Sequence, residues 1–155
     1  MLIIGVDPGP EYSAWLRWSY PEEEILDMEI CRSEDLASRI GQYPFDVLSV
    51  EHFACMGQMV SRSVFDTCYW IGELRSWAKA WSTKWFPVFR KDIKMHFCED
   101  NRVKDKNIRR ALIDRFGEPG TKKAKGRLYG VKKDLWSALA IAVYTADTLG
   151  GNYGG

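Results

Sequence analysis

The sequence has no CxxC pair and no long apolar run, and each absence excludes a class of protein. The four cysteines are widely scattered, so neither a zinc finger nor a redox dithiol is indicated. No apolar stretch approaches the roughly 20 residues that span a bilayer. No basic segment precedes the first apolar stretch, as it would in a secretory signal. We therefore expect reduced thiols, a cytoplasmic location and no membrane contact.

The chain also has little net charge, only +1 over 155 residues, but this balance hides two oppositely charged halves. Residues 1–60 carry 11 acidic and 3 basic side chains, whereas residues 61–155 carry 10 acidic and 19 basic ones. A polyanionic partner such as nucleic acid would explain the basic half. Two solvated faces of opposite sign in one domain are the alternative explanation.

Five short apolar or alternating segments predict strands, at 2–7, 13–20, 23–31, 46–51 and 85–89. The short links between the first three predict an antiparallel meander. A right-handed crossover would place the fourth strand parallel to the first, and Pro87 favours an edge position for the fifth.

Apolar residues spaced by three and four predict helices between and after these strands. The longest runs from Gly57 to Trp81, shorter ones lie around 93–97 and 108–116, and a last helix spans 134–149. Ser33 is the expected N-cap of another short helix. The pattern predicts an α/β fold with a mixed five-stranded sheet flanked by helices. We expect a single domain over 1–149 and a flexible tail at 150–155.

Three carboxylates stand where a core would not accept them. Asp7 ends the first strand, Glu51 ends the fourth, and Asp134 starts the last helix. If the two strands are parallel neighbours, their ends lie side by side, and the last helix need only begin near them. Carboxylate oxygens favour Mg²⁺ or Mn²⁺, and two such ions about 4 Å apart promote phosphodiester hydrolysis. Turn formation at Asp7 and capping at Asp134 are the simpler alternatives, but the basic second half favours a metal site.

The segments "IIGVDPGP", "LSVEHF" and "DLWSALAIA" resemble, in order, the acidic motifs of RuvC-type Holliday-junction resolvases in the RNase H-like superfamily. The resemblance implies an RNase H-like fold and a homodimeric endonuclease of DNA recombination and repair, which makes paired cuts in four-way junctions. It assigns Asp7, Glu51 and Asp134 as catalytic ligands of Mg²⁺ or Mn²⁺, with two ions per site. The long helix is the expected dimer interface. The short length favours a phage or viral relative, acting in the host cytoplasm.

The same resemblance implies DNA contacts in the basic half. The segment "FPVFRKDIKMHF" is similar to one that carries a family lysine near DNA, which assigns Lys94. The second basic position falls on Lys104 or Lys106. The loop 121–133 has six basic residues and no acidic one, which predicts phosphate contacts for Lys122, Lys123 and Lys125.

Two positions depart from the family pattern. Ser137 stands where a fourth carboxylate is usual, which predicts a weaker second metal ion, and Ala54 stands where an aromatic residue is frequent. Strand alternation points His52 away from the metal site, and His96 is an expected surface or phosphate contact. Two alternatives stay open: a nuclease for flap, fork or RNA–DNA hybrid substrates, and a non-catalytic DNA-binding module. An actin-like ATPase is disfavoured, because it would need a second lobe.

Overall fold

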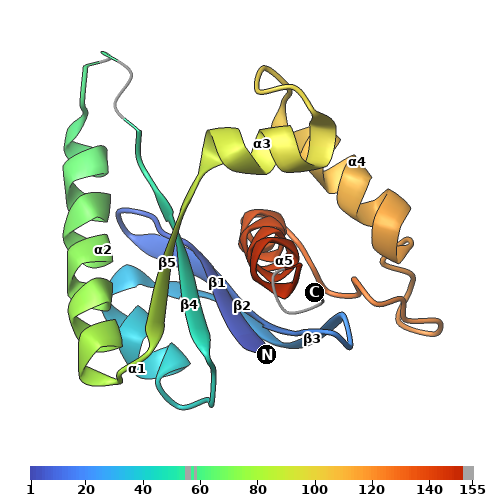
Figure 1. The fold of residues 1–155 in the computed structure, drawn as a ribbon, viewed down its shortest axis with the longest axis horizontal. Helices are drawn as coiled ribbons and strands as arrows, with labels where there is room; N and C mark the ends of the chain where they lie inside the picture. The colour runs from blue at the N-terminus through green and yellow to red at the C-terminus, as the bar shows by residue number, and fades with distance from the viewer. Residues whose placement is uncertain (55–56, 58, 152–155) are drawn as a thin grey trace.

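A computed structural model of the chain shows an α/β fold in which helices cover both faces of one sheet (Figure 1). The structure describes residues 1–54, 57 and 59–151. The strands are β1 (Leu2–Asp7), β2 (Tyr12–Ser19), β3 (Glu24–Arg32), β4 (Val47–His52) and β5 (Lys84–Phe89). The helices are a 3₁₀ turn η1 (Ser33–Asp35), α1 (Leu36–Ile40), α2 (Arg62–Ala80), α3 (Arg90–Cys98), α4 (Asp105–Phe116) and α5 (Leu135–Gly150).

The sheet has the order β3-β2-β1-β4-β5. β1 and β2 pair antiparallel, as do β2 and β3, whereas β1 and β4, and β4 and β5, pair parallel. This arrangement confirms the predicted meander followed by parallel strands. It also confirms the edge position of the strand that contains Pro87, where a missing backbone donor costs no sheet hydrogen bond. The carboxyl ends of β1, β4 and β5 therefore meet at one edge of the sheet.

Two separate cores lie on the two faces of the sheet. Ile4 and Val6 of β1 pack in the core formed with α1 and α2, whereas Ile3 packs in the core formed with α5. Gly5 faces α5 so closely that an added Cβ would lie 2.4 Å from the carbonyl oxygen of Ala138. Helix α5 therefore lies directly against β1, and its first turn is held near the end of that strand.

A buried pair of hydroxyl groups fixes the same helix to β4. Ser49 Oγ lies 2.6 Å from Thr145 Oγ1, and Thr145 itself donates to the carbonyl oxygen of Ile141. Because both groups are fully buried and partnered, they hold α5 in one register on the sheet. The docking of α5 thus depends on specific contacts to β1 and β4, in addition to its apolar surface.

Several predicted boundaries differ from those observed. The long helix begins at Arg62, not at Gly57, and ends at Ala80, one residue before the predicted Trp81. Ser33 is not the N-cap of a helix: it begins η1, and its hydroxyl is used elsewhere. Helix α5 extends to Gly150, which was predicted to belong to the flexible tail 150–155. Residues 152–155 of that predicted tail lie outside the described residues. None of the described helices has the length and apolar character needed to cross a membrane.

Candidate active site

Sheet register places Asp7 beside Glu51. β1 and β4 pair in parallel with Val6 opposite Val50, so the next residues of the two strands are neighbours. Val6 and Val50 are buried in the core formed with α1 and α2. Because side chains alternate along a strand, Asp7 and Glu51 extend toward the other face, where α5 begins. The two acidic strand ends thus meet as predicted.

The two carboxyl groups interact strongly. Burial, followed by the charges of Glu51 and Asp134, raises the pKa of Asp7 from 3.8 to about 7. Burial also raises the pKa of Glu51. The interaction between the two side chains raises the pKa of Asp7 further and lowers that of Glu51, against the larger effect of burial. Two carboxylates that are neighbours and partly buried repel each other, so either a proton on one of them or a cation between them stabilises the pair.

Both side chains line a cleft of about 610 Å³. This volume lies within the usual range for ligand sites. One wall comes from the end of β4 and the segment after it, and the other comes from α3 and its flanks, with lining residues His52, Phe53, Ala54, Phe89, Arg90, Lys91, Lys94 and Asn101. The positive charge of Lys94 lowers the pKa of Glu51, against the larger effect of burial. Lys94 thus lines the same cleft as the carboxylate pair, and its predicted contact with DNA stays a prediction.

Asp134 lies near this pair without joining it. It occupies the N-cap position of α5 and is exposed, and its charge raises the pKa of Asp7. Among the described residues its side chain makes no cap hydrogen bond, so ordinary capping does not account for it. Over all the residues that the structure describes, no three His, Cys, Asp or Glu side chains are grouped closely enough to hold a metal ion. The structure therefore brings together two of the three predicted ligands and leaves the third close by.

Arg90 is a member of the site that the sequence analysis missed. It follows β5 directly, so it lies at the carboxyl end of the third parallel strand. Its Nη1 lies 3.9 Å from Glu51 Oε1 and donates a hydrogen bond to Ser137 Oγ at 3.3 Å. Its Nη2 lies 2.5 Å from Asp105 Oδ1. The available signal was a charged residue directly after the predicted strand 85–89, comparable with the acidic residues that end the strands 2–7 and 46–51.

The turn after Asp7 is held by hydrogen bonds from distant elements. The Gly9 N–H donates to Ser13 Oγ at 3.1 Å, and Ser33 Oγ donates to the Gly9 carbonyl at 2.7 Å. Trp70 Nε1 of α2 donates to the Pro10 carbonyl at 3.0 Å. The turn is therefore stabilised by groups other than the Asp7 carboxylate, which weakens the alternative that Asp7 serves only to form the turn.

The other predicted basic residues lie outside the cleft lining. Lys104 is the N-cap residue of α4, and both it and Lys106 are exposed. The loop lysines Lys122, Lys123 and Lys125 are also exposed, and Lys125 Nζ lies 5.0 Å from the centre of the Tyr129 ring. The structure thus leaves these five side chains accessible to a partner without bringing them to the carboxylate pair.

The two histidines have partners of their own. His52 packs against the rings of Trp85 and Phe89. Burial and the charge of Arg75 on α2 lower its pKa, and the residue also lines the cleft that contains the carboxylate pair. His96 Nε2 lies 2.7 Å from Asp147 Oδ2, so this ring is engaged with α5.

The carboxylate pair fits a hard divalent cation. Asp7 and Glu51 offer oxygen donors, which Mg²⁺ and Mn²⁺ prefer. A cation between the two groups would offset the repulsion that raises the pKa of Asp7. Asp134 adds negative charge to the same region. The donor set is thus suitable in chemistry, with two members in contact and a third nearby.

No known protein-family profile matches the chain, and no curated protein sequence matches it. Solved structures do match. RuvC from Thermus thermophilus has a TM-score of 0.71 at 15% identity, covering 97% of this chain and 97% of that one. The T. thermophilus RuvC complex with a Holliday junction substrate gives 0.70 at 12% identity, covering 98% and 96%. The yeast mitochondrial Holliday junction resolvase Ydc2 gives 0.61 at 11% identity, covering 93% and 75%. The chain therefore has the RNase H-like fold of RuvC-type resolvases, as its motifs predict.

Proposed function

We propose that the protein is a metal-dependent endonuclease that binds four-way DNA junctions and resolves them by paired phosphodiester hydrolysis. The observation that carries this proposal is the partly buried Asp7–Glu51 pair at the carboxyl ends of two parallel strands, in a cleft with Lys94. Likeness over nearly the whole chain to solved junction resolvases supports it.

Each acidic residue has a role in this proposal. Asp7 and Glu51 would hold Mg²⁺ or Mn²⁺ in their ionised forms, and Asp134 at the start of α5 would complete the ligand set. When bound, such an ion would supply Lewis acidity for attack on the phosphodiester and for departure of the leaving oxygen. The prediction of two ions per site stays a prediction, because Ser137 offers a neutral hydroxyl where a fourth carboxylate would bind.

The basic residues bind and orient DNA in this proposal. Lys94 in the cleft contacts the phosphate that is to be cut, where its charge compensates that of the carboxylates and the phosphate. The exposed lysines outside the cleft contact phosphates farther away, namely Lys104, Lys106, Lys122, Lys123 and Lys125. Affinity then depends on the lysines, and cleavage depends on the carboxylates.

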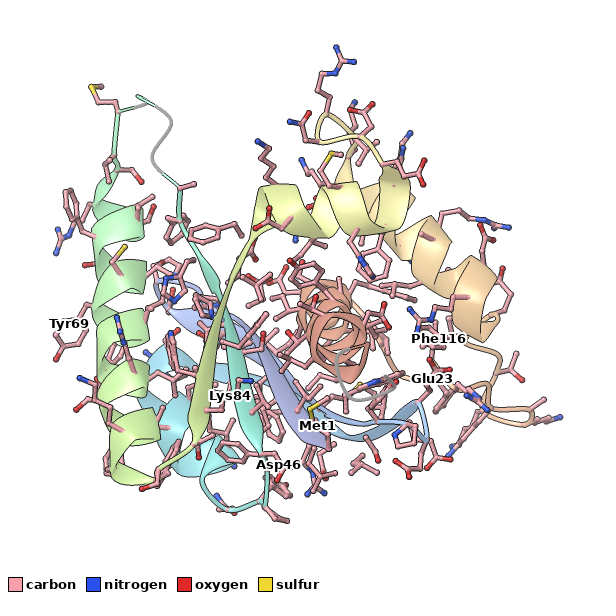
Figure 2. All side chains as sticks on the ribbon, in the orientation of Figure 1. Met1, Glu23, Asp46, Tyr69, Lys84 and Phe116 are labelled. Carbon is pink, nitrogen blue, oxygen red and sulfur yellow. The ribbon has the colours of Figure 1, made fainter. Side chains whose placement is uncertain are left out.

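We further propose that α2 forms the interface of a homodimer. Its outer face carries three large exposed side chains at intervals of four and eight, Phe65, Tyr69 and Trp77, whose exposed fractions are 65%, 67% and 46%. Figure 2 shows Tyr69 extending from α2 away from the sheet. Residues of one helix at such intervals share one face, and a junction with two-fold symmetry needs two sites related by a two-fold axis. A second copy of the chain is therefore the expected occupant.

A cleavage assay tests the catalytic proposal. Labelled four-way junction, duplex, flap, fork and RNA–DNA hybrid are incubated with the protein in Mg²⁺ or Mn²⁺. We expect symmetric paired nicks in the junction alone. Cutting of the other substrates would favour a related structure-specific nuclease, and binding without any cutting would favour a non-catalytic DNA-binding module.

Three variants test the site itself. Asp7→Asn, Glu51→Gln and Asp134→Asn should each abolish cleavage and keep junction binding, because binding depends on Lys and Arg contacts to phosphate. Near-normal cleavage by any one variant would remove that residue from the ligand set.

Sedimentation of the wild type and of Tyr69→Glu at micromolar concentration tests the proposed dimer interface. We expect a dimer for the wild type and a monomer for the variant.

A further inference from the structure

Arg90 connects the carboxylate pair to a helix that contributes no proposed ligand. Its guanidinium lies between Glu51, Ser137 and Asp105, which belong to β4, α5 and α4. The contact to Asp105 is 2.5 Å long, and the contact to Glu51 is 3.9 Å long. The arginine is therefore held more closely by the acid outside the cleft than by the acid within it.

The fork shape of a guanidinium explains how one side chain serves both sides. Nη1 is directed to Glu51 and to the Ser137 hydroxyl, and Nη2 is directed to Asp105. A lysine ammonium is a single point of charge and would not reproduce this division. Ser137, at the position where the family motif predicts a carboxylate, accepts a hydrogen bond from this cation.

A fixed positive charge this close to Glu51 competes with a metal ion. A guanidinium about 4 Å from a carboxylate stabilises the ionised carboxylate in the absence of metal and repels a divalent cation that approaches it. The competition weakens if Asp105 neutralises the guanidinium and holds it back. Asp105 has a side-chain exposure of 71%, so screening by water reduces these effects below their values in a dry interior.

We propose that Arg90 and Asp105 are a pair of positioning residues that sets the metal affinity of the Asp7–Glu51 site. Arg90 lowers that affinity by acting as an internal cation beside Glu51, and Asp105 raises it by binding Arg90. This inference rests on the proposed metal-dependent function and extends it to two residues outside the proposed ligand set. Arg90 contacts the ligand Glu51, and Asp105 acts through Arg90. The pair also gives Ser137 a role, because the Ser137 hydroxyl accepts a hydrogen bond from Arg90 and holds the guanidinium beside Glu51.

Calorimetric titration of DNA-free protein with Mn²⁺ tests the pair without measuring cleavage. Arg90→Met keeps the length of the side chain and removes its charge, and it should tighten Mn²⁺ binding roughly tenfold. Asp105→Asn should weaken binding by a similar factor, because the released guanidinium then pairs with Glu51. Matched controls come from the exposed Arg110–Asp114 pair of α4, with N···O distance 2.9 Å. Arg110→Met and Asp114→Asn should leave the affinity within about twofold.

The double variant Arg90→Met/Asp105→Asn separates two mechanisms. If Asp105 acts through Arg90, the double variant should match Arg90→Met alone. A further loss of affinity in the double variant would mean that Asp105 attracts the ion directly and would overturn the proposal. So would unchanged affinity in both single variants, with circular dichroism used to verify that each is folded. Arg90→Lys provides a second check, because it keeps the charge and should not tighten binding.

The outcomes distinguish this proposal from the nuclease proposal. Opposite shifts in Mn²⁺ affinity without cleavage of any branched DNA would support the pair and contradict the nuclease. Cleavage of junctions with unchanged affinity in the variants would support the nuclease and contradict the pair. Absence of Mn²⁺ binding by the wild-type protein would overturn the pair.

Discussion

Replacing Asp7 by Asn should stabilise the metal-free protein at pH 8. The pKa of Asp7 is raised to about 7, first by burial and then by the charges of Glu51 and Asp134, so ionising this carboxyl in the folded protein costs free energy. Asn is neutral at every pH and similar in shape, so it avoids that cost. A substitution that removes one of the proposed metal ligands would thus increase the free energy of unfolding.

The size and the pH range follow from the two pKa values. Well below pH 3.8 the carboxyl is protonated in the folded and the unfolded chain, and well above pH 7 it is ionised in both. Between these values only the unfolded chain releases the proton, so the stability of the wild type falls as the pH rises through this range. The difference between 3.8 and about 7 corresponds to at most about 4 kcal/mol. The cleft is open to water on one side, which lowers the expected gain to roughly 2 kcal/mol, or about 4–8 °C in Tm for a chain of this size.

Thermal unfolding with chelator present, at about pH 3 and at pH 8, measures the effect. We expect Asp7→Asn to melt above the wild type at pH 8 and together with it at about pH 3, and the exposed control Asp114→Asn to differ little at either pH. Without chelator, added Mn²⁺ should raise the Tm of the wild type at pH 8 and close the gap. An Asn variant that melts at or below the wild type at pH 8, or a gap that is equally large at about pH 3, would refute the reasoning.

Three further results are expected. Gly5→Ala should destabilise the protein by roughly 1–3 kcal/mol in denaturant unfolding, because its Cβ would meet the Ala138 carbonyl at 2.4 Å and displace α5; an unchanged midpoint would contradict the close packing. Ser33→Ala should cost about 1–2 kcal/mol, since it removes the buried donor to the Gly9 carbonyl, whereas the exposed control Ser38→Ala should cost less. Junction affinity should fall by roughly 10³–10⁵ between 50 and 200 mM salt, and an unchanged slope after Ala replacement would place these loop lysines away from DNA: Lys122, Lys123 and Lys125.

Local sequence patterns were sufficient for the sheet and for the acidic pair. Alternation and short links specify the meander, and Pro87 marks the edge, because each depends on neighbouring residues only. Asp7 and Glu51 were found because a carboxylate at the end of an apolar strand is unusual. Their contact then follows from the parallel register of β1 and β4.

Contacts between distant segments were the part that could not be predicted. Arg90 becomes part of the site only because α4 and α5 return to bring Asp105 and Ser137 to it. Ser33 has the residue type of an N-cap, but a better use of its hydroxyl exists at Gly9, 24 positions earlier in the chain. Both cases depend on tertiary structure that a local pattern does not contain.

Helix α4 is attached at both ends by arginine–carboxylate bridges. Arg90 holds Asp105 at its first residue, and Arg115 near its end binds Asp147 at 2.6 Å and Glu23 at 2.7 Å. Figure 2 shows Glu23 close to Phe116, the last residue of this helix. These bridges are partly exposed to water, so dissolved ions weaken them. Ionic strength should therefore act on the folded protein itself, in addition to its effect on the proposed binding of DNA. The amide hydrogens of α4 should exchange with solvent faster at high salt even when no nucleic acid is present.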